Sequence, residues 1–314
     1  MLDTDFFSTY MLPAVLAFIM FGMGLSLTVK DFQHVFLYPK DITVGLIGQL
    51  ILLPAVAFGL AYVSGLRPEF QVGIMIVAAC PGGAVSNLIT HLVRAKVALS
   101  VSMTAINSLV TPFTIPLLLT LALYVFMGNE REVGLPFWET VRNVFFTTLL
   151  PCAIGIYVRY QRQNLAEKLQ VPLDYVMPTL LAIAMIASIF LEEGDASADL
   201  DFEQYLRLSP VMLALNLIAL LGGYQLARLL GLDEGSQITI GIEVSLLNTG
   251  LAIFVATAGQ MLDNQAMAGP AVVYALFTFF SAAGFGIYVK RELLFRIWKR
   301  RWQQLKRQGR KDES

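Results

Sequence analysis

Long apolar runs separated by short polar loops dominate the chain. Runs of about 20 residues are long enough to cross a lipid bilayer as helices, whereas strands of a membrane barrel are much shorter. The pattern therefore predicts an all-α integral membrane protein with about nine transmembrane helices. The predicted spans are 9–28, 42–63, 70–93, 97–127, 138–158, 173–191, 209–230, 236–260 and 267–289.

Composition supports a membrane protein and excludes a soluble domain. Hydrophobic residues make up 56% of the 314 residues and charged residues only 14%, against roughly a quarter charged in soluble domains. The basic segment 290–314 follows the last span. It predicts a cytoplasmic, interfacial tail and no nucleic-acid partner. The lipid bilayer is the expected partner, and the sequence indicates no obligate protein partner.

Charges in the loops predict the orientation of the chain. Lys and Arg follow the first, third and fifth spans and fill the tail, whereas 192–203 is acidic. Positive charge marks the cytoplasmic side. We therefore expect a multi-pass protein of the plasma (inner) membrane, with its N-terminus outside and its C-terminus in the cytoplasm.

Two of the predicted spans contain residues that interrupt helices. The third span reads Cys-Pro-Gly-Gly at 80–83, and the eighth reads Asn-Thr-Gly at 248–250. Pro81 removes a backbone donor, and glycine lowers the cost of unwinding. The two spans are five apart and so cross in opposite directions. Opposed broken helices in corresponding positions are typical of an inverted-repeat transporter.

Glu243 lies inside the eighth span, just before its interruption. A carboxylate at bilayer depth costs several kcal/mol unless it is paired or coordinated, so it marks a functional site. No Lys or Arg lies at mid-depth in any predicted span. A sodium ion or a proton is therefore the expected counter-charge. A structural ion pair is the alternative.

Side chains with oxygen atoms occur at several other positions within the spans. Ser86 and Asn87 follow the first break, Ser100 and Thr104 lie one helical turn apart, and Gln49 is in mid-span. Oxygen ligands suit hard cations such as sodium. The alternatives are local bonds to backbone carbonyls or helix packing. No nucleophile–base pair or metal triad accompanies these residues, so an enzyme is not expected.

In these residues the chain resembles the bile acid:sodium symporter family over nearly its full length. The resemblance is carried by 20–25, 80–83, 97–100, Glu243 and 248–250. It implies panel and core domains with two crossing discontinuous helices. The implied boundaries are panel helix 1 at 1–41, core helices 2–4 at 42–128, panel helices 5–6 at 129–208, core helices 7–9 at 209–289 and a basic cytoplasmic tail at 290–314.

The resemblance also implies two sodium sites. The first would use Ser86, Asn87, Ser100, Thr104 and Glu243. The second would use Gln49, Glu243 and the carbonyls of Val244 and Leu246, with a glutamine at the position of Leu247. Leucine has no side-chain oxygen, so we expect one tightly bound sodium and a weakened or absent second. A transport Hill coefficient for sodium clearly near two would contradict this expectation.

The resemblance places the substrate at Gly83, Ala84, Asn248 and Thr278. Ala84 and Thr278 differ from the family pattern, so bile acid itself is not expected. Helix N-termini at a break favour anions, which indicates a small organic carboxylate. Na⁺ would be the coupling ion, with no organic cofactor. The rival interpretations are a proton-coupled or uncoupled organic anion carrier of the same fold, and a receptor or sensor with a vestigial transport site.

Overall fold

A computed structural model describes residues 10–28, 37–128, 137–169, 172–173, 176, 202–258 and 261–289. Within these residues the protein is helical, and the only extended pairing is an isolated backbone bridge between Gly82 and Leu247. The helices are α2 (Leu12–Ser26), α4 (Pro39–Ile47), α5 (Leu53–Val63), α6 (Pro68–Ala79), α7 (Ala84–Leu92), α8 (Val97–Ala122), α9 (Phe137–Val144), α10 (Leu150–Gln161), α12 (Phe202–Leu229), α13 (Glu234–Ser245), α14 (Thr249–Thr257) and α15 (Gly269–Val289).

Five helical stretches in the described residues are long and apolar enough to cross a membrane. They are Pro39–Val63, Val97–Met127, Trp138–Gln161, Glu203–Leu229 and Ala266–Tyr288. The protein is thus a multi-pass membrane protein, as the apolar runs predicted. The predicted span at 173–191 lies almost entirely outside the described residues, as do the acidic loop up to 201 and the tail at 290–314.

Two of the spanning helices contain a π-helical turn that ends two residues before a proline. The turn Gly48–Leu52 precedes Pro54, and Phe145–Leu149 precedes Pro151. A proline within a helix lacks an amide donor and clashes with the carbonyl four residues earlier, so a wider turn accommodates it. The first of these turns contains Gln49, whose side chain is turned into the interior and is 2% exposed.

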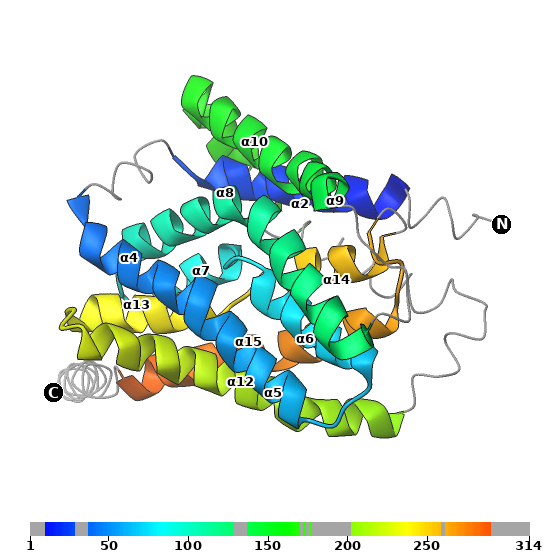
Figure 1. Ribbon diagram of the computed structural model, residues 1–314. Helices are drawn as coiled ribbons and strands as arrows, with labels where there is room; N and C mark the ends of the chain where they lie inside the picture. Colours follow the sequence, from blue (N-terminus) through cyan, green and yellow to red (C-terminus); the bar gives the residue numbers. More distant parts are fainter. Residues whose placement is uncertain are drawn as a thin grey trace, which may run out of the picture.

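Helices α2, α9 and α10 lie together along one side of the molecule (Figure 1). The contact between α2 and α10 is close because glycines face backbone on both helices. A methyl group on Gly24 would lie 2.9 Å from the Cα of Cys152, and one on Gly155 would lie 2.8 Å from the backbone of Gly24 and Leu25. Small residues that let backbones approach are the usual means of packing helices in a membrane.

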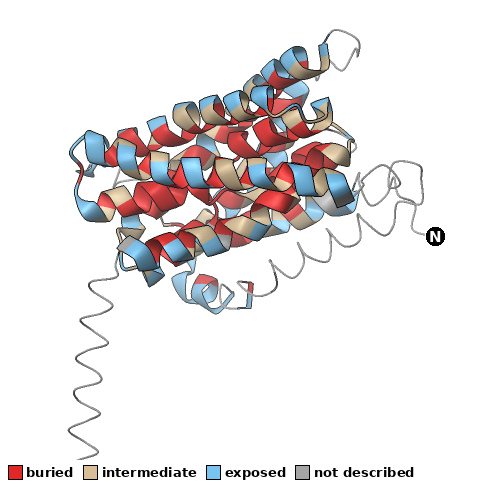
Figure 2. Ribbon diagram, turned by 90° about the horizontal axis from the view of Figure 1, so that it is seen from below, coloured by how far each residue is buried: buried red, intermediate tan, exposed pale blue. Residues whose placement is uncertain are grey.

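The remaining helices surround the two broken spans. Buried residues gather on the helix faces that turn inward, and exposed residues lie on the outer faces (Figure 2). Helices α12 and α13 pack closely, since a methyl group on Gly241 would lie 2.8 Å from the Leu220 carbonyl oxygen. Helix α12 starts at residue 202, before the predicted start of its span at 209, and an exposed Glu203–Arg207 ion pair lies in its first turns.

A polar cluster joins the N-terminal ends of α4, α8 and α13. The Lys96 ammonium donates to Asp41 at 3.3 Å and to Asp233 at 2.5 Å, and the Ser236 hydroxyl donates to both carboxylates. Asp233 also caps α13 by accepting from the Ser236 amide at 3.3 Å. The Lys96 amide donates to the Thr239 hydroxyl at 3.0 Å. The cluster therefore fixes three helix ends relative to one another.

We expect Lys96→Met to lower the free energy of unfolding by about 1 kcal/mol at neutral pH, because Lys96 and Asp233 are partly exposed and water screens their attraction. Partial burial acts to raise the pKa of Asp233, but the hydrogen bonds from Lys96 and Ser236, together with the positive charge of Lys96, outweigh it and hold that pKa below its ordinary 3.8. The stabilisation is therefore present at neutral pH and is lost as the pH falls through the lowered pKa.

Thermal unfolding of the purified protein in detergent measures this effect. Lys96→Arg keeps the charge and serves as the control, with a melting temperature close to that of the wild type. A melting temperature of Lys96→Met equal to that of Lys96→Arg at neutral pH would show that the cluster does not stabilise the fold.

Candidate ion and substrate site

The two broken spans meet at their interruptions. Gly82 in the first break forms an antiparallel backbone bridge with Leu247 in the second. The Asn248 amide donates to the Pro81 carbonyl at 2.8 Å. Backbone groups that leave a helix at membrane depth need partners inside the protein. Here each break supplies partners for the other, so the contact predicted from two opposed interruptions is present.

Local sequence explains where each helix stops. Cys80 adopts an extended conformation (φ −78°, ψ 145°), which is what a residue before proline favours. Helix α7 then starts after the extended Gly83. In the second break, α13 ends at Ser245, and the Asn248 side chain caps α14 by accepting from the Leu251 amide at 3.0 Å. Proline and glycine open the first break, and an asparagine cap restarts the helix after the second.

Glu243 is fully buried at the crossing of the breaks, with 0% exposure. The Ser100 hydroxyl donates to one of its carboxylate oxygens at 2.5 Å, and the Thr104 hydroxyl donates to the other. The Ser86 hydroxyl also interacts with this carboxylate and lies 2.7 Å from the Gly83 carbonyl oxygen. Three hydroxyl oxygens, from α7 and α8, thus surround one negative charge.

Gly82 lies directly against this carboxylate. A methyl group at this position would be 2.8 Å from the Glu243 carboxyl carbon and 3.5 Å from its Cγ. Only a residue without a side chain leaves the carboxylate in its place between Ser100 and Thr104. Gly83, by contrast, has open space where a methyl group would be.

The structure brings together four of the five residues predicted for the first sodium site: Ser86, Ser100, Thr104 and Glu243. The fifth, Asn87, follows Ser86 on α7, and its buried Oδ1 has no hydrogen-bond partner among the described residues. A buried oxygen without a partner fits a cation ligand. The residues therefore suit a hard cation, with one carboxylate, three hydroxyls and one amide oxygen.

The residues predicted for a second site are more dispersed. The Gln49 side chain faces the first break, where its Nε2 donates to the Cys80 carbonyl at 3.2 Å. The neighbouring Gly48 packs against Val244, with a methyl group there lying 3.1 Å from a Val244 methyl. The Leu246 amide donates back to Ile242 at 2.9 Å. Leu247 takes part in the crossing through its backbone.

Two of the predicted substrate residues, Gly83 and Asn248, lie at the starts of α7 and α14. The Asn248 amide nitrogen is 3.9 Å from the Met20 sulfur on α2, so it lies where the crossing meets that helix. Ala84 is the first residue of α7. Thr278 lies apart from them, where its hydroxyl donates to the Tyr274 carbonyl at 2.8 Å and accepts from Asn216.

Sequence reasoning missed the network behind the second break. The Ser245 carbonyl, at the end of α13, accepts from Asn216 Nδ2 at 3.1 Å and from the Tyr274 hydroxyl at 2.7 Å. Ser281 in turn donates to the Asn216 side-chain oxygen. The sequence did carry a signal for this network, because Asn216, like Gln49, places a side-chain amide in the middle of a predicted span. Tyr274, Thr278 and Ser281 also share one face of α15 at helical spacing.

The chain belongs to the Sodium Bile acid symporter family, whose sequence profile matches residues 13–196. This match covers more than half of the chain and extends through the first broken span and the Ser100–Thr104 helix. The family resemblance seen in the sequence is thereby confirmed. The chain is a member of a family of membrane transporters with sodium-dependent relatives.

Several relatives carry functional names. An uncharacterized sodium-dependent transporter of Bacillus subtilis is 34% identical over 244 residues, covering 77% of this chain and 72% of the relative. A probable chloroplastic sodium/metabolite cotransporter of Arabidopsis thaliana is 30% identical, over 81% of this chain and 60% of the plant protein. The ileal sodium/bile acid cotransporter of Oryctolagus cuniculus is 26% identical, over 88% of this chain and 78% of that protein.

Proposed function

We propose that this protein is a sodium-coupled symporter of a small organic anion. The observation that carries the proposal is the full burial of Glu243 among hydroxyl oxygens at the crossing of two broken helices. None of the ion pairs in the described part of the chain involves Glu243. The carboxylate therefore needs a cation from outside the protein, and both Ser100 and Thr104 direct hydroxyl protons at it, as they would toward an ionised group.

The coupling follows from the cost of a buried charge. Without a cation, the ionised Glu243 is held inside the bundle at a cost of several kcal/mol. A sodium ion at Ser86, Asn87, Ser100, Thr104 and Glu243 neutralises the charge and adds ligands that bridge α7, α8 and α13. Binding of the ion therefore stabilises the crossing from which α7 and α14 start. The single carboxylate supports one tightly bound sodium per cycle.

Two groups of helices support transport by alternating access. The panel would comprise 1–41 and 129–208, and the core 42–128 and 209–289. The close glycine-mediated packing of α2 on α10 suits a rigid panel, while the crossing and the Lys96 cluster tie core helices together. Movement of the core against the panel would expose the site to one side of the membrane at a time. We place the N-terminus outside and the C-terminal tail in the cytoplasm.

The substrate proposal rests on the helix starts beside α2. The N-termini of α7 and α14 carry the positive ends of the helix dipoles, which favour a carboxylate. Gly83 and Asn248 lie at these starts, and the open space at Gly83 leaves room for a ligand. The substrate would therefore bind between the crossing of the two broken helices and the panel helix α2. The relatives' names, a probable sodium/metabolite cotransporter, a sodium-dependent organic anion transporter and a sodium/bile acid cotransporter, support an organic anion as the substrate.

Uptake into proteoliposomes tests this function. Labelled organic anions, from small monocarboxylates to a bile acid, are offered under an inward sodium gradient or under an inward proton gradient with choline replacing sodium. We expect the sodium gradient alone to drive uptake of a small carboxylate. Uptake driven by protons without sodium would favour the proton-coupled carrier, and anion binding without uptake under either gradient would favour the sensor.

A further inference from the structure

Two buried side-chain donors hold the carboxyl end of α13. This helix ends at Ser245, whose carbonyl accepts from Asn216 Nδ2 at 3.1 Å and from the Tyr274 hydroxyl at 2.7 Å. All three residues have 0% exposure. The last carbonyls of a helix have no partner within the helix, and a buried one left unsatisfied is costly. The donors, from α12 and α15, therefore fix the place where α13 ends.

The two donors are themselves held in position. Ser281 donates to the Oδ1 of Asn216, and the Nδ2 of Asn216 also donates to the Thr278 hydroxyl at 3.4 Å. The Thr278 hydroxyl donates in turn to the Tyr274 carbonyl at 2.8 Å. Because both ends of the Asn216 carboxamide are engaged, its Nδ2 stays directed at the end of α13.

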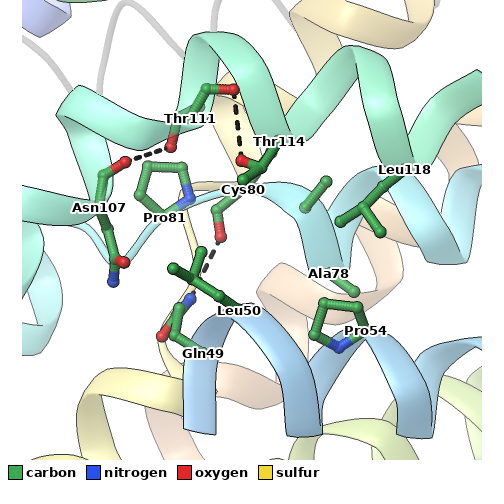
Figure 3. A pocket seen from close by; sticks show the side chains of 11 residues that line it. Gln49, Leu50, Pro54, Ala78, Cys80, Pro81, Asn107, Thr111, Thr114 and Leu118 are labelled. Carbon is green, nitrogen blue, oxygen red and sulfur yellow. Dashed lines mark hydrogen bonds between the residues drawn. The ribbon is translucent and has the colours of Figure 1, made fainter. Parts of the chain in front are cut away.

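The first break is held in the same way. Gln49 Nε2 donates to the carbonyl of Cys80, the residue that directly follows α6 (Figure 3). In each case a carboxamide from the preceding span bonds the carbonyl at the end of the first half of a broken span. Gln49 and Asn216 lie in the second and seventh predicted spans, five apart as the broken spans are. This repetition indicates that holding the helix ends serves the crossing.

The end of α13 is the part of the helix that places Glu243. Glu243 lies two residues before Ser245, and Gly241 lies two residues before Glu243. Gly241 packs against α12, where a methyl group on it would be 2.8 Å from the Leu220 carbonyl oxygen. The turn that carries Glu243 is therefore anchored on both sides, at Gly241 by close packing and at Ser245 by hydrogen bonds.

The carboxylate of Glu243 has little room to move. The Ser100 hydroxyl is 2.5 Å from one of its oxygens, and a methyl group on Gly82 would be 2.8 Å from its carboxyl carbon. A functional site of this kind needs its ligands held within about 0.5 Å of their working positions. Loss of the anchor at Ser245 would let the last turn of α13 shift and carry the carboxylate away from its hydroxyl partners.

We propose that Asn216 and Tyr274 are positioning residues of the sodium site. By holding the Ser245 carbonyl, they keep the Glu243 carboxylate beside Ser100, where the ion binds. They act through the backbone of α13 and are not ligands of the ion. The proposal rests on the proposed sodium-coupled function, and it adds α12 and α15 to the helices that set the affinity for sodium.

Equilibrium binding of sodium-22 to the purified full-length protein, in choline chloride at constant ionic strength, tests the proposal. Tyr274→Phe removes one donor and keeps the ring. We expect it to raise the dissociation constant of sodium about tenfold, which corresponds to about 1.4 kcal/mol and is the size of one net hydrogen bond. Asn216→Leu removes the other donor and should raise it at least as much. Tyr224→Phe is the control, because Tyr224 on α12 packs through its ring on Phe285.

Uptake into proteoliposomes separates positioning from a general loss of stability. In Tyr274→Phe the half-saturating sodium concentration should rise about tenfold while the maximal rate at saturating sodium stays within about twofold of the wild type, since abundant sodium still fills the site. A lower maximal rate with an unchanged half-saturating concentration would overturn the proposal, because it would show a structural role only.

The binding results also distinguish this proposal from the proposed function. A wild type that binds no sodium-22 would contradict both. A wild type that binds sodium, with an unchanged or lowered dissociation constant in Tyr274→Phe and Asn216→Leu, would contradict the positioning role alone. Tyr274→Phe, which keeps the packing of the ring, decides by itself if Asn216→Leu fails to fold.

Discussion

Replacing Glu243 by alanine should abolish sodium-driven uptake of the organic anion. Among the residues that the structure describes, the substitution removes the one carboxylate that Ser100 and Thr104 contact, and it leaves three hydroxyls that bind sodium poorly without it. Removing one partner of a buried charge interaction typically costs about 3–5 kcal/mol, which corresponds to a loss of sodium affinity of at least about 100-fold. Uptake into proteoliposomes under a sodium gradient is the measurement.

Glu234→Ala is the matched control for this prediction. Glu234 lies in the first turn of the same helix, α13, and its side chain is exposed. Its replacement should leave sodium-driven uptake near the wild-type rate. Glu243→Gln, which keeps the shape of the side chain, should behave as Glu243→Ala does. Sodium-driven uptake by either Glu243 variant at the wild-type rate would rule out the carboxylate as the coupling group.

Gly82→Ala should weaken sodium binding about 10- to 100-fold although it adds a single methyl group. The added carbon would lie 2.8 Å from the Glu243 carboxyl carbon, which is too close for the present arrangement. The carboxylate must then move away from Ser100 and Thr104, and misplaced ligands lose much of their interaction energy with an ion. The change in melting temperature between sodium chloride and choline chloride measures this loss.

The adjacent glycine provides the control. A methyl group on Gly83 meets no atom within 4 Å, and the backbone there is extended (φ −126°, ψ 178°). Gly83→Ala should therefore keep the sodium-dependent stabilisation, whatever its effect on uptake of the anion. Equal sodium-dependent stabilisation of Gly82→Ala and the wild type would mean that the carboxylate does not need its present position to bind the ion.

The amino-acid sequence is informative where membrane physics penalises a residue strongly. An acid at Glu243, and a Pro-Gly-Gly run inside an apolar span, are costly at bilayer depth, so each of them indicates a functional site by its position alone. The fold confirms that both spans break and that the breaks touch through Gly82 and Leu247. It also places Ser100 and Thr104 on the carboxylate, as their shared helix face suggested.

Features that depend on three-dimensional contact could not be read from the sequence. The close approach of Gly82 to Glu243 involves two residues far apart in the chain, and a glycine beside a proline already had a local explanation. Likewise, the carbonyl that Asn216 and Tyr274 satisfy is freed by a break elsewhere, so neither residue indicated its role alone.

The most direct test of the central claim is the melting temperature of the purified wild type and of Glu243→Ala, in sodium chloride and in choline chloride at equal ionic strength. A ligand that binds only the folded state stabilises it by about 2.7 kcal/mol at a hundred times its dissociation constant. We predict that sodium raises the melting temperature of the wild type by several degrees and leaves that of Glu243→Ala unchanged. A wild type that sodium does not stabilise, or an equal rise in both proteins, would contradict a sodium site at Glu243.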